Sequence, residues 1–181
     1  MSGDNFTELH KLVGQRDKLA YEAVKSGKVS DLAHEDQLHA QAIQEHMHLK
    51  HVHKALEFAD VREGTPYEIE VGGEVVNPLA HIVTHAAVKS QLEGVPEVRA
   101  AFEKMVATGA SAHHAEHVLG ALLLQYSWEA TRGRTGANNL AKAQAHYERS
   151  LQKLCRDAAF RKKLTRQFRS GSFCFRIMCS H

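Results

Sequence analysis

Two pairs of histidines recur at the same helical spacing in this sequence. His81 and His85 form the first pair, and His113 and His117 form the second. An i, i+4 spacing places both imidazoles on one side of an α-helix, where one metal ion can accept both. A lone buried histidine is ordinarily explained by a hydrogen bond inside the core. Two such pairs on two helices make a facing metal cage the leading hypothesis.

Carboxylates near these histidines extend the candidate ligand set. Glu45 and His48 form an E-x-x-H pair, the spacing used by carboxylate-bridged di-iron bundles, and Glu116 lies beside the second pair. The metal ligands predicted from the sequence are therefore His81, His85, His113, His117, Glu45, His48 and Glu116. Imidazoles and carboxylates without thiolates suit iron, manganese or zinc. We expect a non-haem site with iron favoured, a dinuclear centre as one version, and oxygen or peroxide as a candidate small-molecule ligand.

The remaining histidines do not point to one site. The chain has fourteen histidines, and five of them share the second predicted helix with His48 but face several directions: His34, His39, His46, His51 and His53. Most of these are expected at the surface. A histidine-rich helix that responds to pH is an alternative without metal, because imidazoles titrate near pH 6.5.

The helix that must carry the first pair has clear start and stop signals. Asn77 can cap it, Pro78 occupies the first helical position, and Gly94 with Pro96 ends it. At 100° per residue, His81 and His85 share a narrow stripe with Val88 and Leu92. This stripe must face the interior, so both imidazoles are expected to point inward.

The whole pattern predicts an all-α protein, a helical bundle of about five to six helices with a short β-hairpin insertion. The predicted helices are residues 4–26, about 31–60, 77–93, 96–108, 111–132 and about 139–164, and the hairpin turns at Gly72-Gly73. In the second helix, Glu45 is placed in the apolar stripe, where a carboxylate needs a partner. We expect one domain over residues 1–164, with the metal-site core at about 31–132, and a poorly ordered basic tail over 165–181.

Composition narrows the class of protein. The net charge of +2 does not favour nucleic acid as a partner, although residues 156–181 hold seven Lys or Arg against one acid. No apolar run is long enough to span a membrane, and the polar N-terminus does not resemble a signal peptide. We expect a soluble cytoplasmic protein without a membrane partner, and homo-oligomerisation stays open. The chain has no Gly-rich phosphate loop and no GxSxG motif, so the sequence assigns no catalytic residue.

A family resemblance rests on the segment NPLAHIVTHAAVKSQL, on VRAAFEKMVATG after it, and on the second HxxxH with Trp128 beyond. This pattern resembles an uncharacterised bacterial domain-of-unknown-function family over about residues 77–133. That family often has a carboxylate one turn after each HxxxH, where this chain has Lys89 and Ala121. The resemblance implies no activity. More distantly, the architecture is similar to hemerythrin and ferritin-like helical metal proteins.

A second hypothesis comes from a different class of function. In it, the protein is a non-catalytic helical interaction or structural module whose histidines pack and form hydrogen bonds. Metal content separates the two hypotheses.

Overall fold

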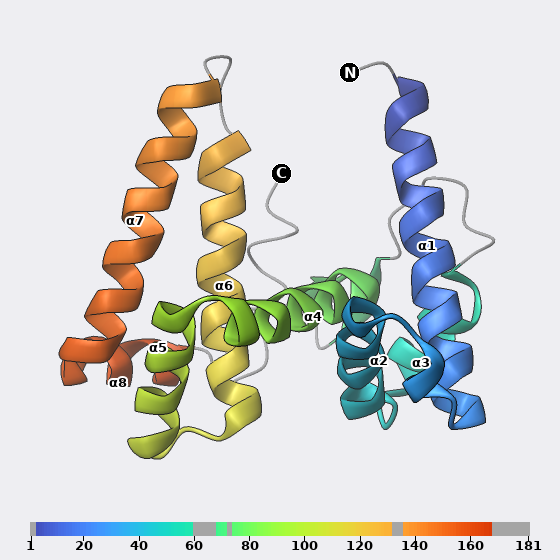
Figure 1. Cartoon of the computed structure of the whole chain (residues 1–181), viewed down its shortest axis with the longest axis horizontal. Helices are drawn as coiled ribbons and strands as arrows, with labels where there is room; N and C mark the ends of the chain where they lie inside the picture. The colour runs from blue at the N-terminus through green and yellow to red at the C-terminus, as the bar shows by residue number, and fades with distance from the viewer. Residues whose placement is uncertain (1–2, 60–67, 72–73, 132–135, 168–181) are drawn as a thin grey trace. The chain divides into compact units, whose positions relative to one another are not determined.

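The chain folds into two compact units. The computed structural model describes residues 3–59, 68–71, 74–131 and 136–167, and its contacts divide into Met1–Ala86 and Ala87–His181 (Figure 1). The boundary falls inside one helix, α4 (Pro78–Gly94). Each unit has a separate apolar core. The single bundle domain over residues 1–164 stays a prediction.

The first unit is built around one long helix. α1 (Gly3–Ser26) packs beside α2 (His34–His46) and α3 (Lys50–Glu57), and a short 3-10 helix, η1 (Val29–Asp31), connects α1 to α2. The core comes from all three α-helices and from the start of α4: Ala20, Tyr21, Ala40, Ala42, Ile43, Val52, Leu56 and Ile82. Gly27, with φ of 70°, makes the turn after α1 that lets α2 return along it.

The second helix predicted from the sequence is two helices. α2 ends at His46, Met47 and His48 form a turn, and Leu49 is extended before α3 begins. Neither glycine nor proline marks this break. Packing explains it, because the chain must turn here for α2 and α3 each to bury an apolar face. Tertiary packing therefore overrides a helical sequence pattern.

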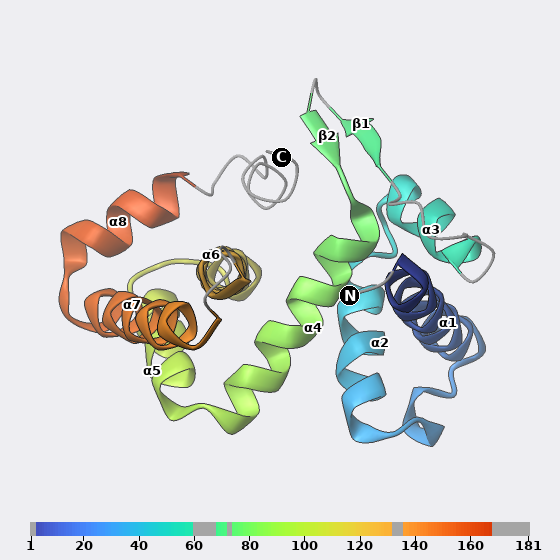
Figure 2. The same ribbon diagram turned by 90° about the horizontal axis from the view of Figure 1, so that it is seen from above.

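A pair of short strands precedes α4. β1 (Ile69–Val71) and β2 (Glu74–Val76) pair antiparallel, with Ile69 opposite Val76 and Val71 opposite Glu74. β2 leads through Asn77 directly into α4 (Figure 2). The cap expected from the sequence is present, because the backbone N–H of Ala80 donates to Oδ1 of Asn77 at 3.0 Å. Residues 60–67, where the hairpin signal begins, lie outside the described residues.

Four further helices build the second unit. α6 (Ala112–Thr131) and α7 (Gly136–Arg156) run antiparallel and make its most extensive contact, while α5 (Pro96–Ala107) and α8 (Ala158–Gln167) pack at one end of this pair (Figure 1). The core between them includes Val98, Met105, Leu119, Leu151 and Leu154. Ser111 caps α6, since the His114 N–H donates to its Oγ at 3.2 Å.

The number of helices differs from the sequence-based prediction. The described residues contain eight α-helices, whereas five to six were expected. The last predicted helix, 139–164, is divided into α7 and α8 at Asp157, whose carboxylate accepts the Phe160 N–H at 2.9 Å and starts α8. Residues 165–167 of the predicted tail complete α8, and 168–181 lie outside the described residues. None of the described helices has the length and apolar character needed to cross a membrane.

The buried Tyr147 should make the stability of the second unit decrease at alkaline pH. The Tyr147 hydroxyl donates to Oε1 of Gln91 at 2.6 Å, and burial raises the pKa of Tyr147 to about 12. In the unfolded chain this phenol ionises near pH 10. The contribution of the Tyr147 phenol to the free energy of unfolding is therefore complete below pH 10 and is lost as pH rises from about 10 to 12.

We expect Tyr147→Phe to cost about 1 kcal/mol at neutral pH through the lost hydrogen bond. The same variant should lose less stability than the wild type between pH 8 and pH 11, because it has no phenol there to ionise. Urea denaturation at both pH values measures this, with Tyr126→Phe as the control. An equal alkaline loss in Tyr147→Phe and wild type would contradict the assignment.

Candidate metal centre

Three imidazoles converge inside the first unit. His46 comes from the last turn of α2, and His81 and His85 come from successive turns of α4. Their ring centroids lie 4.7 Å apart for His46 and His81, 4.6 Å for His46 and His85, and 4.7 Å for His81 and His85. The exposed fractions of the three side chains are 1%, 6% and 2%. Both histidines of the first predicted pair are therefore buried, as the stripe on α4 predicts.

The core of the first unit holds these rings in place. Ile43 on α2 and Ile82 on α4 belong to the same apolar cluster and are fully buried. His46 follows Ile43 by one turn, while His81 and His85 flank Ile82 on the same side of α4. Packing of this apolar cluster thus brings the three imidazoles together on α2 and α4.

A backbone hydrogen bond orients the ring of His46. Its Nδ1 lies 2.7 Å from the carbonyl oxygen of Ala42, an acceptor, so Nδ1 carries the proton. The lone pair of the neutral ring is then on Nε2, which lies 3.0 Å from Nε2 of His81. Metal-binding histidines commonly donate the other ring N–H to a carbonyl in this way. The first unit therefore presents one oriented imidazole to a second one.

The predicted Glu-x-x-His pair is not formed on one helix. Glu45 is exposed on α2, and His48 is exposed in the turn that follows it. The placement of Glu45 in the buried stripe is wrong, because the buried positions of α2 follow the sequence Leu38, Ala42, His46. A carboxylate oxygen of Glu45 nevertheless lies within 4.8 Å of a ring nitrogen of His85. Glu45 can thus reach the histidine cluster from its edge.

The second unit carries its own donor group on the first turns of α6. The rings of His113 and His117 lie 4.4 Å apart, and a carboxylate oxygen of Glu116 lies within 4.8 Å of a ring nitrogen of His113. Glu116 is buried, and its Oε1 accepts a hydrogen bond from Nζ of Lys89 at 3.2 Å. Lys89 supplies a positive charge that compensates for this burial. The cage shared by both histidine pairs stays a prediction.

Several other histidines have partners that explain them without a metal ion. His53 contacts the Tyr21 hydroxyl at 3.1 Å, and His114 donates to the carbonyl oxygen of Thr165 at 2.8 Å. In the second unit, His146 lies 2.8 Å from a carboxylate oxygen of Glu129. These contacts belong to helix packing, and they reduce the number of histidines that require a ligand.

His46 is the cluster residue that the sequence analysis did not select. It belongs to the histidines of the second predicted helix, most of which are expected at the surface. A signal was present, since Leu38, Ala42 and His46 follow one another at i+4 and therefore share the buried face of α2. The sequence-based prediction missed this signal because it extends one helix through residues 47–49. In such a helix the apolar stripe includes Glu45 instead of His46.

A buried pair of one carboxylate and one imidazole in the same unit provides a contrast with the metal candidates. His39 Nε2 lies 2.6 Å from Oδ1 of Asp17, and the exposed fractions of the two residues are 3% and 1%. At the surface nearby, Arg16 forms an ion pair with Asp36, also at 2.6 Å.

We expect Asp17→Ala to lower the free energy of unfolding by about 3 kcal/mol or more, because it leaves His39 buried without its acceptor. Asp36→Ala, the matched surface control, should cost less than about 1 kcal/mol. Urea denaturation of both variants tests this contrast. Equal losses would show that burial does not set the energy of the Asp17–His39 contact.

Comparison with known proteins gives a family without an activity. No curated protein and no solved structure matches the chain. One family model, described as a domain of unknown function (DUF1841), matches residues 15–148. The match contains α2, α4 and α6 and covers all the candidate metal ligands, including His48 in the turn after α2. The resemblance to an uncharacterised family is thereby confirmed, and the chain belongs to the DUF1841 family.

Proposed function

We propose that this protein binds a transition-metal ion through His46, His81 and His85. The observation that carries the proposal is the buried Nε2-to-Nε2 approach of His46 and His81 at 3.0 Å, with His46 oriented by the Ala42 carbonyl. Without an ion, a proton on one Nε2 satisfies this contact. A metal ion takes the place of that proton, and neutral imidazoles are suitable ligands for it.

The donor types favour iron among the candidate metals. Imidazole and carboxylate donors without thiolates suit iron, manganese or zinc. Three imidazoles leave coordination positions for the Glu45 carboxylate and for water, oxygen or peroxide. We extend the proposal to oxygen-linked redox chemistry, with Glu45 as the bridging carboxylate if two irons bind.

The second unit adds a separate donor group to this proposal. His113 and His117 present two imidazoles from one side of α6, with the Glu116 carboxylate beside them. Lys89 competes with any cation for Glu116, so the two imidazoles are the primary donors there. Metal stoichiometry distinguishes one ion per chain from two.

The first test is the metal content of the untagged protein, purified without nickel and measured by inductively coupled plasma mass spectrometry. We expect stoichiometric iron in the wild type, with near-ultraviolet charge-transfer bands if two irons share an oxygen. His81→Ala/His85→Ala should lose this metal, because it removes two of three imidazoles. His46→Gln, which changes one ligand and keeps a polar side chain, should lose it as well.

The matched control is His34→Ala/His48→Ala, which removes two exposed histidines from the same unit. It should keep the full metal content. Metal loss in this control would return the ligand assignment to His48 and the Glu-x-x-His pair. Full metal in His81→Ala/His85→Ala would contradict the proposal directly.

The alternative function is a helical interaction or structural module. The partners of His39, His53, His114 and His146 favour it, because each of these histidines has a protein contact of its own. A module of this kind has no ion to lose.

Chelation separates the two functions in one experiment. An ion that binds only the folded state raises its stability, so a strong chelator should lower the melting temperature of the wild type by several degrees. The same chelator should leave His81→Ala/His85→Ala unchanged. An unchanged wild-type melting temperature, with no metal found by elemental analysis, would favour the interaction module.

A further inference from the structure

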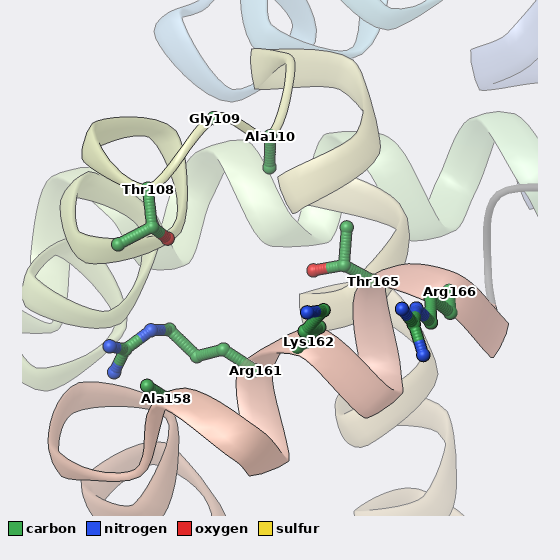
Figure 3. A pocket seen from close by; sticks show the side chains of 8 residues that line it. All are labelled: Thr108, Gly109, Ala110, Ala158, Arg161, Lys162, Thr165 and Arg166. Atoms are coloured by element: carbon green, nitrogen blue, oxygen red, sulfur yellow. The ribbon is translucent and has the colours of Figure 1, made fainter.

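The second unit contains a cavity of about 380 Å³ that the metal proposal does not use. Its walls come from the turn between α5 and α6 and from one side of α8 (Figure 3). The lining residues are Thr108, Gly109, Ala110, Ala158, Arg161, Lys162, Thr165 and Arg166. This volume is near the lower end of the range for small-molecule sites, about 300–1,000 Å³. We propose that the cavity binds the phosphate group of a phosphorylated small molecule.

The lining of the cavity is positively charged. Three of the eight lining residues are cationic and none is acidic. α8 has the sequence AAFRKKLTRQ, with four cations and no carboxylate. Lys162 and Arg166 are exposed, and neither has a hydrogen bond or ion pair with any other residue in the described ranges. A solvated helix face explains cations that point outward, but these side chains line a recess.

Arg161 provides the buried part of the site. Its exposed fraction is 7%, and its Nη1 donates to the carbonyl oxygens of Leu154 at 2.6 Å and Cys155 at 2.9 Å. These bonds at the end of α7 hold the guanidinium in position. Within the part of the chain that the structure describes, no acceptor contacts its Nε or Nη2. A phosphate oxygen can accept from such N–H groups and supplies the negative charge that a buried guanidinium lacks.

The turn on the opposite side acts as a wall rather than as a donor. Gly109 has φ of 98°, its N–H donates to Val106, and the Ala110 N–H donates to Met105, which closes the end of α5. The Thr108 hydroxyl donates to the carbonyl oxygen of Lys104 at 2.9 Å. These donors are already engaged within the turn. Recognition of an anion must therefore come from the cationic side chains of α8.

The shape and residue types of the cavity favour a small molecule over a nucleic acid. Single-stranded nucleic acids are held by an extended basic groove and by aromatic side chains that stack on the bases. The lining contains no aromatic residue. Figure 3 shows Arg161 and Arg166 toward opposite ends of the recess, with Lys162 between them. This arrangement suits one compact phosphate-bearing ligand.

Isothermal titration calorimetry in phosphate-free buffer tests the proposal with ribose 5-phosphate, AMP and inorganic phosphate as probes. We expect at least one phosphorylated probe to bind the full chain, and ribose and adenosine not to bind. Lys162→Ala/Arg166→Ala should weaken that binding about tenfold or more, because it removes two charged donors. Lys163→Ala, a cation on the same helix outside the cavity, should keep wild-type affinity.

Three outcomes would overturn the proposal. One is the absence of heat with all three phosphorylated probes. Another is an equal loss of affinity in Lys163→Ala, which would indicate general attraction to a basic helix. The third is preferential, steeply salt-dependent binding of an oligoribonucleotide over every small probe, since that is typical of a nucleic-acid surface. Circular dichroism and melting curves of both variants verify that they are folded.

Discussion

The cost of burying imidazoles constrains the first unit more than any other interaction. His46, His81 and His85 lie where water does not satisfy their nitrogens, so each ring must find a partner inside the protein. The Ala42 carbonyl satisfies one nitrogen of His46 and aims the other at His81. An apolar side chain in place of His46 would fill the space more simply. We propose that the three polar rings at this point of the core share one ligand.

The same physical constraint has different solutions elsewhere in the chain. Oδ1 of Asp17 and Nε2 of His39 form a hydrogen bond, and the Lys89 ammonium compensates the Glu116 carboxylate. These contacts pair opposite or complementary groups. The cluster of His46, His81 and His85 instead brings together groups of one type, and a cation is the partner that neutral imidazoles have in common. This difference in chemistry separates the metal candidate from the structural histidines.

The two proposed sites differ in how the fold creates them. In the first unit, α2 and α4 both contribute to the apolar cluster beside the ligands, so the site depends on the core itself. In the second unit, the cavity depends on the C-terminal ends of two helices. Backbone hydrogen bonds form the turn after α5, and Arg161 donates a hydrogen bond to the last turn of α7. The first site offers lone pairs and the second offers N–H donors. They are consequently suited to a cation and an anion, respectively.

Local signals in the sequence determined much of the helical structure and part of the site. Asn77 and Pro78 start α4, Ser111 caps α6, and the i, i+4 spacing places His81 with His85 and His113 with His117, because these effects act within one or two turns. Tertiary structure decided what local signals do not contain. The turn at Met47 and His48 has no glycine or proline to mark it, and it exists because α2 and α3 both bury apolar faces in the first unit. That turn exposes His48, ends α2 at His46 and thereby brings His46 to the histidine pair on α4. Its position depends on contacts between distant segments, which the spacing of residues along one helix does not encode.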